Sequence, residues 1–282
     1  MNLVKRLGRI ILALCWGALP GKADLLPFPL KANQHGLVYC LENPTIHYDV
    51  LLPAGYSTNG PPLPILYTFS PVGGGMVNDL GLQCNQLKVI CIGITESQND
   101  VGWYPVMREC AAVTRDIRRR VLFDPTAEFA AGFSGGGLVS YMFSRFRAQQ
   151  VAGIFTMAGW LGRGAGYPDY QTTDRVLTNL LVARARGDTD GGNWVMTPDS
   201  NYLATFSVNI HDVVFSGGHE IPPAGVKSNC LAWLISQRVP AAPGDQTNAV
   251  AQADDWRTRI AGGDREIVLR ECVRALLDHP RS

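Results

Sequence analysis

The chain has 282 residues, a formal net charge of +1 and 46% hydrophobic residues, an ordinary composition for a globular protein. Its length suits one large domain with a full hydrophobic core. The near-neutral charge, with no basic run beyond the first ten residues, argues against nucleic-acid binding.

The first 23 residues have the pattern of a secretory signal peptide. Lys5, Arg6 and Arg9 form a positively charged start, and residues 10–19 form an apolar run too short for an ordinary membrane span. Small residues follow within 21–23, where a signal peptidase would cleave. We therefore expect residues 1–23 to be removed, the protein to be secreted or periplasmic, and no stable membrane span.

Beyond residue 23, apolar strand-like runs alternate with segments of helical spacing. The expected strands cover residues 45–52, 65–69, 89–94, 129–133, 154–159, 180–185 and 208–215. The expected helices cover residues 76–87, 108–122 and 226–239, with a further helix-compatible segment after residue 137. This alternation predicts an α/β fold with a mostly parallel central sheet and helices on both faces.

A Pro- and Gly-rich breaker at 240–245 ends this pattern. Two further helical stretches follow, at about 247–261 and 264–278. We expect a main domain over residues 24–240 and a short C-terminal helical extension, interpreted as packing, over 241–282.

Residues 132–136, Gly-Phe-Ser-Gly-Gly, carry the main chemical signal of the chain. An apolar strand precedes them and a helix-compatible segment follows, the context in which a serine is held exposed on a sharp strand-to-helix turn. We expect the glycines at 132 and 136 to be required because strand and helix approach closely there. Ser134 is therefore the candidate nucleophile.

A serine nucleophile needs a base to take its proton and an acid to orient that base. Of the five histidines, only His219 lies in a glycine-rich loop directly after the last strand. Asp188 and Asp190 both follow the strand at 180–185, and the residues alone leave the choice between them open. Whichever is not the acid is expected to hydrogen-bond its own loop backbone.

The developing oxyanion needs N–H donors. Gly135, directly after the serine, is the first candidate, and Val72 or Gly73, in the loop after the strand at 65–69, is the second. Six cysteines remain beyond residue 23 and permit disulfides, but no Cys or Cys/His spacing suits a metal site. The chemistry requires no cofactor.

These motifs resemble the α/β-hydrolase fold, and within it the exported esterases related to feruloyl esterases and polyhydroxybutyrate depolymerases. Residues 48–56, the 132–136 motif and Gly217-Gly218-His219 are similar to that group. Residues 186–190, Arg-Gly-Asp-Thr-Asp, resemble its His-Gly-x-x-Asp stretch, which implies Asp190 as the acid. The sequence departs from the group at Arg186 and at residues 69–73, where His-Gly is usual.

Four aromatic residues, expected in loops after strands, are candidates for substrate binding: Trp103, Tyr104, Trp160 and Trp194. Loop packing explains them equally well. Together the residues predict a secreted serine hydrolase that cleaves a small or polymer-linked carboxylic ester through an acyl-enzyme. The alternatives are a serine peptidase of the same fold and a hydrolase-like binding protein without turnover.

Overall fold

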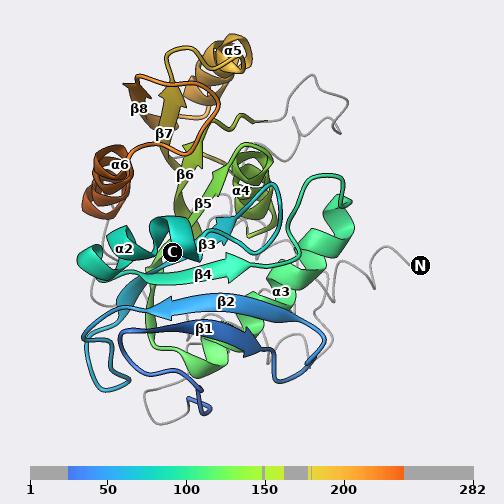
Figure 1. Cartoon of the computed structure of the whole chain (residues 1–282), viewed down its shortest axis with the longest axis vertical. Helices are drawn as coiled ribbons and strands as arrows, with labels where there is room; N and C mark the ends of the chain where they lie inside the picture. The colour runs from blue at the N-terminus through green and yellow to red at the C-terminus, as the bar shows by residue number, and fades with distance from the viewer. Residues whose placement is uncertain (1–24, 148–149, 162–176, 179, 238–282) are drawn as a thin grey trace, which may run out of the picture. The chain divides into compact units, whose positions relative to one another are not determined.

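The computed structural model describes residues 25–147, 150–161, 177–178 and 180–237. The expected signal peptide and C-terminal extension lie outside these residues. Eight strands form one sheet in the order β1-β2-β4-β3-β5-β6-β7-β8, which runs from bottom to top in Figure 1. The pairs β1–β2 and β2–β4 are antiparallel, and all the others are parallel.

The elements alternate along the chain as the apolar pattern predicted. The strands are β1 Gln34–Tyr39, β2 His47–Leu52, β3 Leu63–Phe69, β4 Ile90–Ile94, β5 Phe123–Phe133, β6 Val151–Met157, β7 Leu181–Gly187 and β8 Asn209–Phe215. The helices are α2 Val77–Leu87, α3 Trp103–Arg120, α4 Gly135–Phe146, α5 Asn193–Ala204 and α6 Ala224–Gln237.

Helices cover both faces of the sheet. Helices α2 and α6 contact each other on one face, and α3 and α4 contact each other on the opposite face. The strands between them are almost fully buried: every residue of β4 is buried, as its continuous apolar run predicts. The predicted α/β-hydrolase fold, with its mostly parallel sheet, is confirmed.

Four elements differ from the sequence prediction. Strand β5 begins at Phe123, not at residue 129. Helix α3 begins at Trp103, not at residue 108, because Pro105 is tolerated in the first turn of a helix, where its missing N–H needs no partner. Helix α5 was missed since its apolar residues follow no clear helical period and Pro198 lies inside it. The edge strand β1 was also missed.

The described cysteines, at positions 40, 84, 91, 110 and 230, are all buried free thiols. Burial raises the pKa of Cys40 and of Cys230 to about 12, so these thiols stay protonated at neutral pH. Within the described residues, no helix is both long and apolar enough to cross a membrane.

Candidate active site

Ser134 lies on a sharp turn between β5 and α4. Its backbone has φ 51° and ψ −120°, a conformation that non-glycine residues rarely adopt. A Cβ on Gly132 would lie 2.1 Å from the carbonyl oxygen of Gly136, and one on Gly136 would lie 2.1 Å from that of Phe69. The expected close approach at both glycines is confirmed. Because α4 begins at Gly135, its positive N-terminal end adjoins the serine.

The structure brings Ser134, His219 and Asp190 within hydrogen-bonding distance, although they come from three separate loops. His219 Nε2 lies 2.8 Å from Ser134 Oγ, and His219 Nδ1 lies 3.1 Å from Asp190 Oδ2. With its proton on Nδ1, the imidazole donates to the carboxylate and accepts from the serine hydroxyl. The Phe133 ring packs against the imidazole, with 5.2 Å between ring centroids.

Burial differs along this hydrogen-bonded series. The Asp190 side chain is 1% exposed, whereas that of His219 is 42% exposed. A buried carboxylate can hold an imidazole in one tautomer, while an exposed imidazole remains accessible to a substrate. Exposure therefore increases from the carboxylate to the imidazole.

Asp188 and Asp190 occupy different positions in their shared loop. Only Asp190 contacts His219, and its Oδ1 also accepts the N–H of Gly192 at 2.7 Å. Asp188 Oδ1 instead accepts the N–H of Gly217 at 3.0 Å, in the loop that carries the histidine. The expectation that the second aspartate would bond its own loop backbone was therefore wrong.

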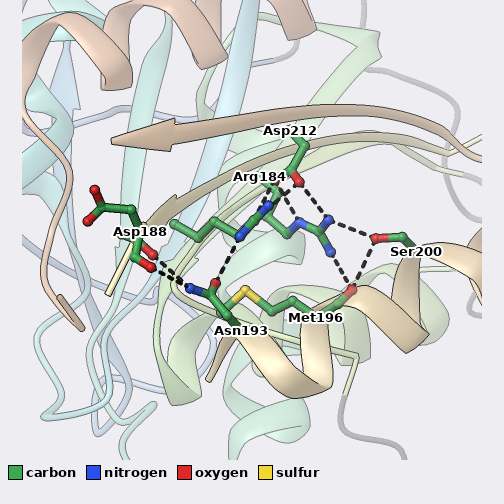
Figure 2. Close-up of polar contacts among 8 residues, drawn as sticks. Arg184, Asp188, Asn193, Met196, Ser200 and Asp212 are labelled. Atoms are coloured by element: carbon green, nitrogen blue, oxygen red, sulfur yellow. Dashed lines mark hydrogen bonds and ion pairs between the residues drawn. The ribbon is translucent and has the colours of Figure 1, made fainter. Parts of the chain in front are cut away.

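Two arginines on β7 support the loop that carries Asp190 through hydrogen bonds to α5 and to β8. Arg184 forms a two-pronged ion pair with Asp212 at 3.0 and 3.1 Å, and it also donates to α5 through Met196 O and Ser200 Oγ (Figure 2). Arg186 donates to Asn193 Oδ1 at 3.2 Å. The other side of that amide donates to the carbonyl oxygen of Gly187 at 2.9 Å (Figure 2).

Asp212 lies at the centre of this network. Burial alone would raise the pKa of its carboxyl, but hydrogen bonds and charge from Arg184 and Arg186 outweigh burial and hold that pKa below its usual value. Asp212 thus stays ionised and keeps both guanidinium groups in place. Arg186, which replaces the histidine usual in the resembled group, is part of this support and does not contact His219 in any interaction described.

The loop after β3, residues 70–75, lies against the loop after β4, residues 95–99. Asn99 N–H donates to Pro71 O at 2.8 Å, and Gly74 N–H donates to Thr95 O at 2.9 Å. Val72 N–H donates to Ser70 Oγ at 3.2 Å, and the residue Val72 is 82% exposed. Gly73 has φ +86°, which a side chain would strain.

A buried carboxylate anchors the 95–99 loop. Glu109, on α3, accepts the N–H groups of Thr95 and Glu96 at 3.0 and 3.1 Å and the Thr95 hydroxyl at 3.2 Å. Burial raises the pKa of Glu109 to about 7, although these donors favour the ionised form. No local pattern predicts this contact, because the partners are 14 and 13 residues apart in the chain and Glu109 lies on a helix.

The four candidate aromatic residues have different surroundings. Trp103 and Tyr104 form the first turn of α3 and Trp194 that of α5, so the expectation that they lie in loops was wrong. Trp160 does lie in the segment after β6 and is half-buried. Tyr104 and Trp194 are 79% and 77% exposed, which loop packing does not explain.

Within the described residues, no group of three or more His, Cys, Asp and Glu side chains is arranged to hold a metal ion. Ser134, His219 and Asp190 have the residue types and the hydrogen-bonding order of a nucleophile, a base and an orienting acid. The loops that carry them lie at the carboxyl edge of the sheet, where ligands bind in open α/β folds.

Comparison with known proteins supports the same class of fold. No family model matches the chain, and no curated protein matches it in sequence. Solved structures do match: the S-formylglutathione hydrolase FrmB of Staphylococcus aureus has a TM-score of 0.53 at 14% identity, over 74% of this chain and 99% of its own. Est1E of Butyrivibrio proteoclasticus, solved with ferulic acid, has a TM-score of 0.52 at 14% identity, over 72% and 98%.

A structure from an analysis of two fungal esterases from Rhizomucor miehei matches with a TM-score of 0.54 at 15% identity, over 82% of this chain and 88% of its own. At such low identity the likeness establishes the α/β-hydrolase fold. The structural neighbours themselves are esterases and serine hydrolases.

Proposed function

We propose that the protein is an exported serine hydrolase that cleaves carboxylic esters through an acyl-enzyme. The observation that carries the proposal is the continuous hydrogen-bonded series from Ser134 Oγ through His219 to the buried carboxylate of Asp190, at 2.8 and 3.1 Å. Each member has the chemistry that its position requires: a nucleophile on a strained turn, a base and an orienting acid.

In the acylation step, Ser134 Oγ attacks the ester carbonyl while His219 Nε2 accepts the hydroxyl proton. The imidazolium that forms is stabilised by its hydrogen bond to the side chain of Asp190. His219 then returns the proton to the departing alkoxide, so the alcohol leaves neutral and the acyl group stays on Ser134. Water repeats the sequence on the acyl-enzyme and releases the acid.

The oxyanion formed at each attack needs preorganised donors. We assign the first to the N–H of Gly135, because α4 begins there and the first N–H groups of a helix have no partner within it. The second is assigned to the N–H of Val72 or Gly73, in the neighbouring 70–75 loop. Loss of one such donor costs about 3 kcal/mol of transition-state stabilisation.

The exposed aromatic side chains suggest a substrate with an apolar or aromatic portion. Tyr104 and Trp194 expose most of their surface, and Trp103 and Trp160 are half-buried. We propose that these four residues contact the acyl or alcohol group of the ester. Export follows from the signal-peptide pattern of residues 1–23.

Hydrolysis of short-chain aryl esters by purified wild-type protein and by Ser134→Ala tests the proposal. The wild-type protein should turn over acetyl or butyryl esters, and the variant should lose this activity while keeping its circular dichroism spectrum and melting temperature. Equal activity of the two proteins would reject the role of Ser134.

A substrate panel separates ester from peptide cleavage. Acetyl, butyryl and feruloyl esters and matched peptide amides should be compared on one preparation. The proposal predicts ester turnover far above peptide turnover, and the reverse ranking would assign a peptidase. A protein that hydrolyses neither and forms no adduct with a fluorophosphonate would be a binding protein.

A further inference from the structure

The side chain of Asn99 lies directly against Gly135. A Cβ built on Gly135 would be 2.0 Å from Asn99 Oδ1 and 3.5 Å from Asn99 Nδ2. That position is about 2.5 Å from the Gly135 nitrogen by standard bond geometry, so the carboxamide adjoins the proposed first oxyanion donor. A Cβ at residue 135 would require the Asn99 carboxamide to move away.

The backbone of Asn99 is fixed in this place. Its N–H donates to Pro71 O at 2.8 Å, and Gln98 pairs with Val72 as an isolated antiparallel bridge. The other end of the loop is held by Glu109, through the N–H groups of Thr95 and Glu96. The backbone that carries the carboxamide is therefore held beside Gly135, where an electrostatic stabiliser of the transition state would have to lie.

The Asn99 side chain makes no hydrogen bond with any other part of the chain that the structure describes, and the residue is exposed. A planar carboxamide carries two N–H donors and one acceptor, and rotation by 180° exchanges the oxygen and the nitrogen. A negative charge forming beside Gly135 N–H would favour the orientation with an N–H toward it. The carboxamide N–H groups of Asn99 can therefore donate to an oxyanion that forms beside Gly135.

In the neighbouring 70–75 loop, one of the candidate oxyanion donors already has a hydrogen-bond acceptor. Val72 N–H already donates to Ser70 Oγ at 3.2 Å. A side-chain donor from the 95–99 loop supplements the backbone donors at this point.

We propose that Asn99 Nδ2–H donates a hydrogen bond to the substrate carbonyl oxygen as it becomes an oxyanion, next to the N–H of Gly135. This inference rests on the proposed serine-hydrolase function. It makes Asn99 a catalytic residue that acts on the transition state more than on the bound ester. No proton or electron is transferred to Asn99 at any step.

Substitution of Asn99 in the full chain tests the inference. Asn99→Ala should lower kcat for ester hydrolysis roughly 100-fold with little change in KM. Affinity for a boronic acid, whose tetrahedral adduct resembles the transition state, should fall by a similar factor. Asn99→Asp should lower kcat further, because a carboxylate repels the oxyanion. Asn209→Ala, at an exposed asparagine at the start of β8, is the matched control and should behave as wild type.

A double-variant cycle with Gly135→Ala separates an electrostatic role from simple packing. The added methyl would displace the Asn99 carboxamide, so Gly135→Ala alone should also lose activity. If the carboxamide acts on the oxyanion, Gly135→Ala/Asn99→Ala should be as inactive as Asn99→Ala. Recovery of the double variant to wild-type activity would show that Asn99 is only a steric neighbour and would overturn the inference.

Fluorophosphonate labelling keeps the two proposals distinguishable. If wild type is active and labelled, and Asn99→Ala keeps kcat and boronic-acid affinity within threefold of wild type, only the role of Asn99 is rejected. If wild type neither hydrolyses esters nor forms an adduct, the proposed function fails and the role of Asn99 fails with it.

Discussion

The two sides of Ser134 are held in place by different means. On one side, the turn from β5 to α4 is fixed by backbone contacts so close that Gly132 and Gly136 allow no side chain. On the other side, the 70–75 loop rests on the 95–99 loop, and a single buried carboxylate, Glu109, anchors that second loop. The first arrangement depends on local steric fit alone. The second also includes a close backbone approach, since a Cβ on Gly75 would lie 2.3 Å from Gly93 Cα, but it depends in addition on long-range hydrogen bonds.

This difference explains why one side of the site is evident in the sequence and the other is not. Steric fit at a tight turn requires glycine at fixed spacing, and this spacing is a recognisable pattern in the sequence. A hydrogen bond between a helix side chain and a distant loop leaves no local pattern. The variants below probe each side, from the largest expected effect to the smallest.

The largest effect is expected at the acid. Asp190→Asn should lower kcat about 10⁴-fold, because the amide no longer stabilises the imidazolium or selects its tautomer. Asp188→Asn should lose less than about tenfold, since it weakens only the bond to Gly217 N–H. Steady-state kinetics on both variants measures the ranking, and the opposite ranking would transfer the acid role to Asp188.

A methyl group at the tight turn should cost stability. Gly136→Ala places a Cβ 2.1 Å from Phe69 O and should lower the free energy of unfolding by more than about 3 kcal/mol. Gly225→Ala, whose Cβ would meet nothing within 4 Å, is the matched control and should change stability by less than about 1 kcal/mol. Denaturant unfolding measures both. A Gly136→Ala protein as stable as wild type would show that the turn is not sterically fixed.

On the side of the 95–99 loop, Glu109 should make the free energy of unfolding depend on pH. Its pKa is raised from 4.5 in the unfolded chain to about 7, so the folded state binds the proton more tightly. Its contribution to stability is therefore fully present below pH 4.5 and is lost as pH rises to 7, by about 3 kcal/mol. In Glu109→Gln this part of the pH dependence should vanish.

Denaturant unfolding of wild type, Glu109→Gln and the exposed neighbour variant Glu96→Gln at several pH values checks the expectation. Glu96→Gln should retain most of the wild-type slope between pH 4.5 and 7. A Glu109→Gln protein with the full wild-type slope would mean that another group causes it.

The smallest effect is expected at Arg186, on the strand that leads into the loop of Asp190. Arg186→Ala removes a donor to Asn193, which in turn bonds the Gly187 carbonyl, so the acid should lose alignment without losing its contact. We expect a three- to tenfold lower kcat, unchanged KM and partial rescue in Arg186→Lys, which keeps the charge but not the planar fork. A change in KM alone would instead indicate that Arg186 contacts substrate.

Much of the architecture was predictable because it depends on local patterns. The continuous apolar run of β4 and the alternation of strands and helices indicated the sheet, and the spacing of Gly132 and Gly136 indicated the turn. By contrast, α5 contains Pro198 and lacks a clear period, so its sequence does not resemble a helix. The start of α3 was also not predicted, because Pro105 lies in its first turn and proline usually indicates the absence of a helix.

The site was predictable only in part. His219 was found by its place after the last strand, but the separate partners of Asp188 and Asp190 depend on contacts 29 residues apart. Asn99 carried no motif at all. Its position follows from how two loops pair in space, which no spacing along the chain reveals.

The most direct test of the account is the site of covalent modification. The full chain is incubated with a fluorophosphonate, and the adduct is located by peptide mass spectrometry. We predict one adduct, on Ser134, that is absent in Ser134→Ala and forms much more slowly in His219→Ala, because the imidazole no longer accepts the serine proton. An adduct on another residue, or equal labelling of Ser134→Ala, would contradict the account.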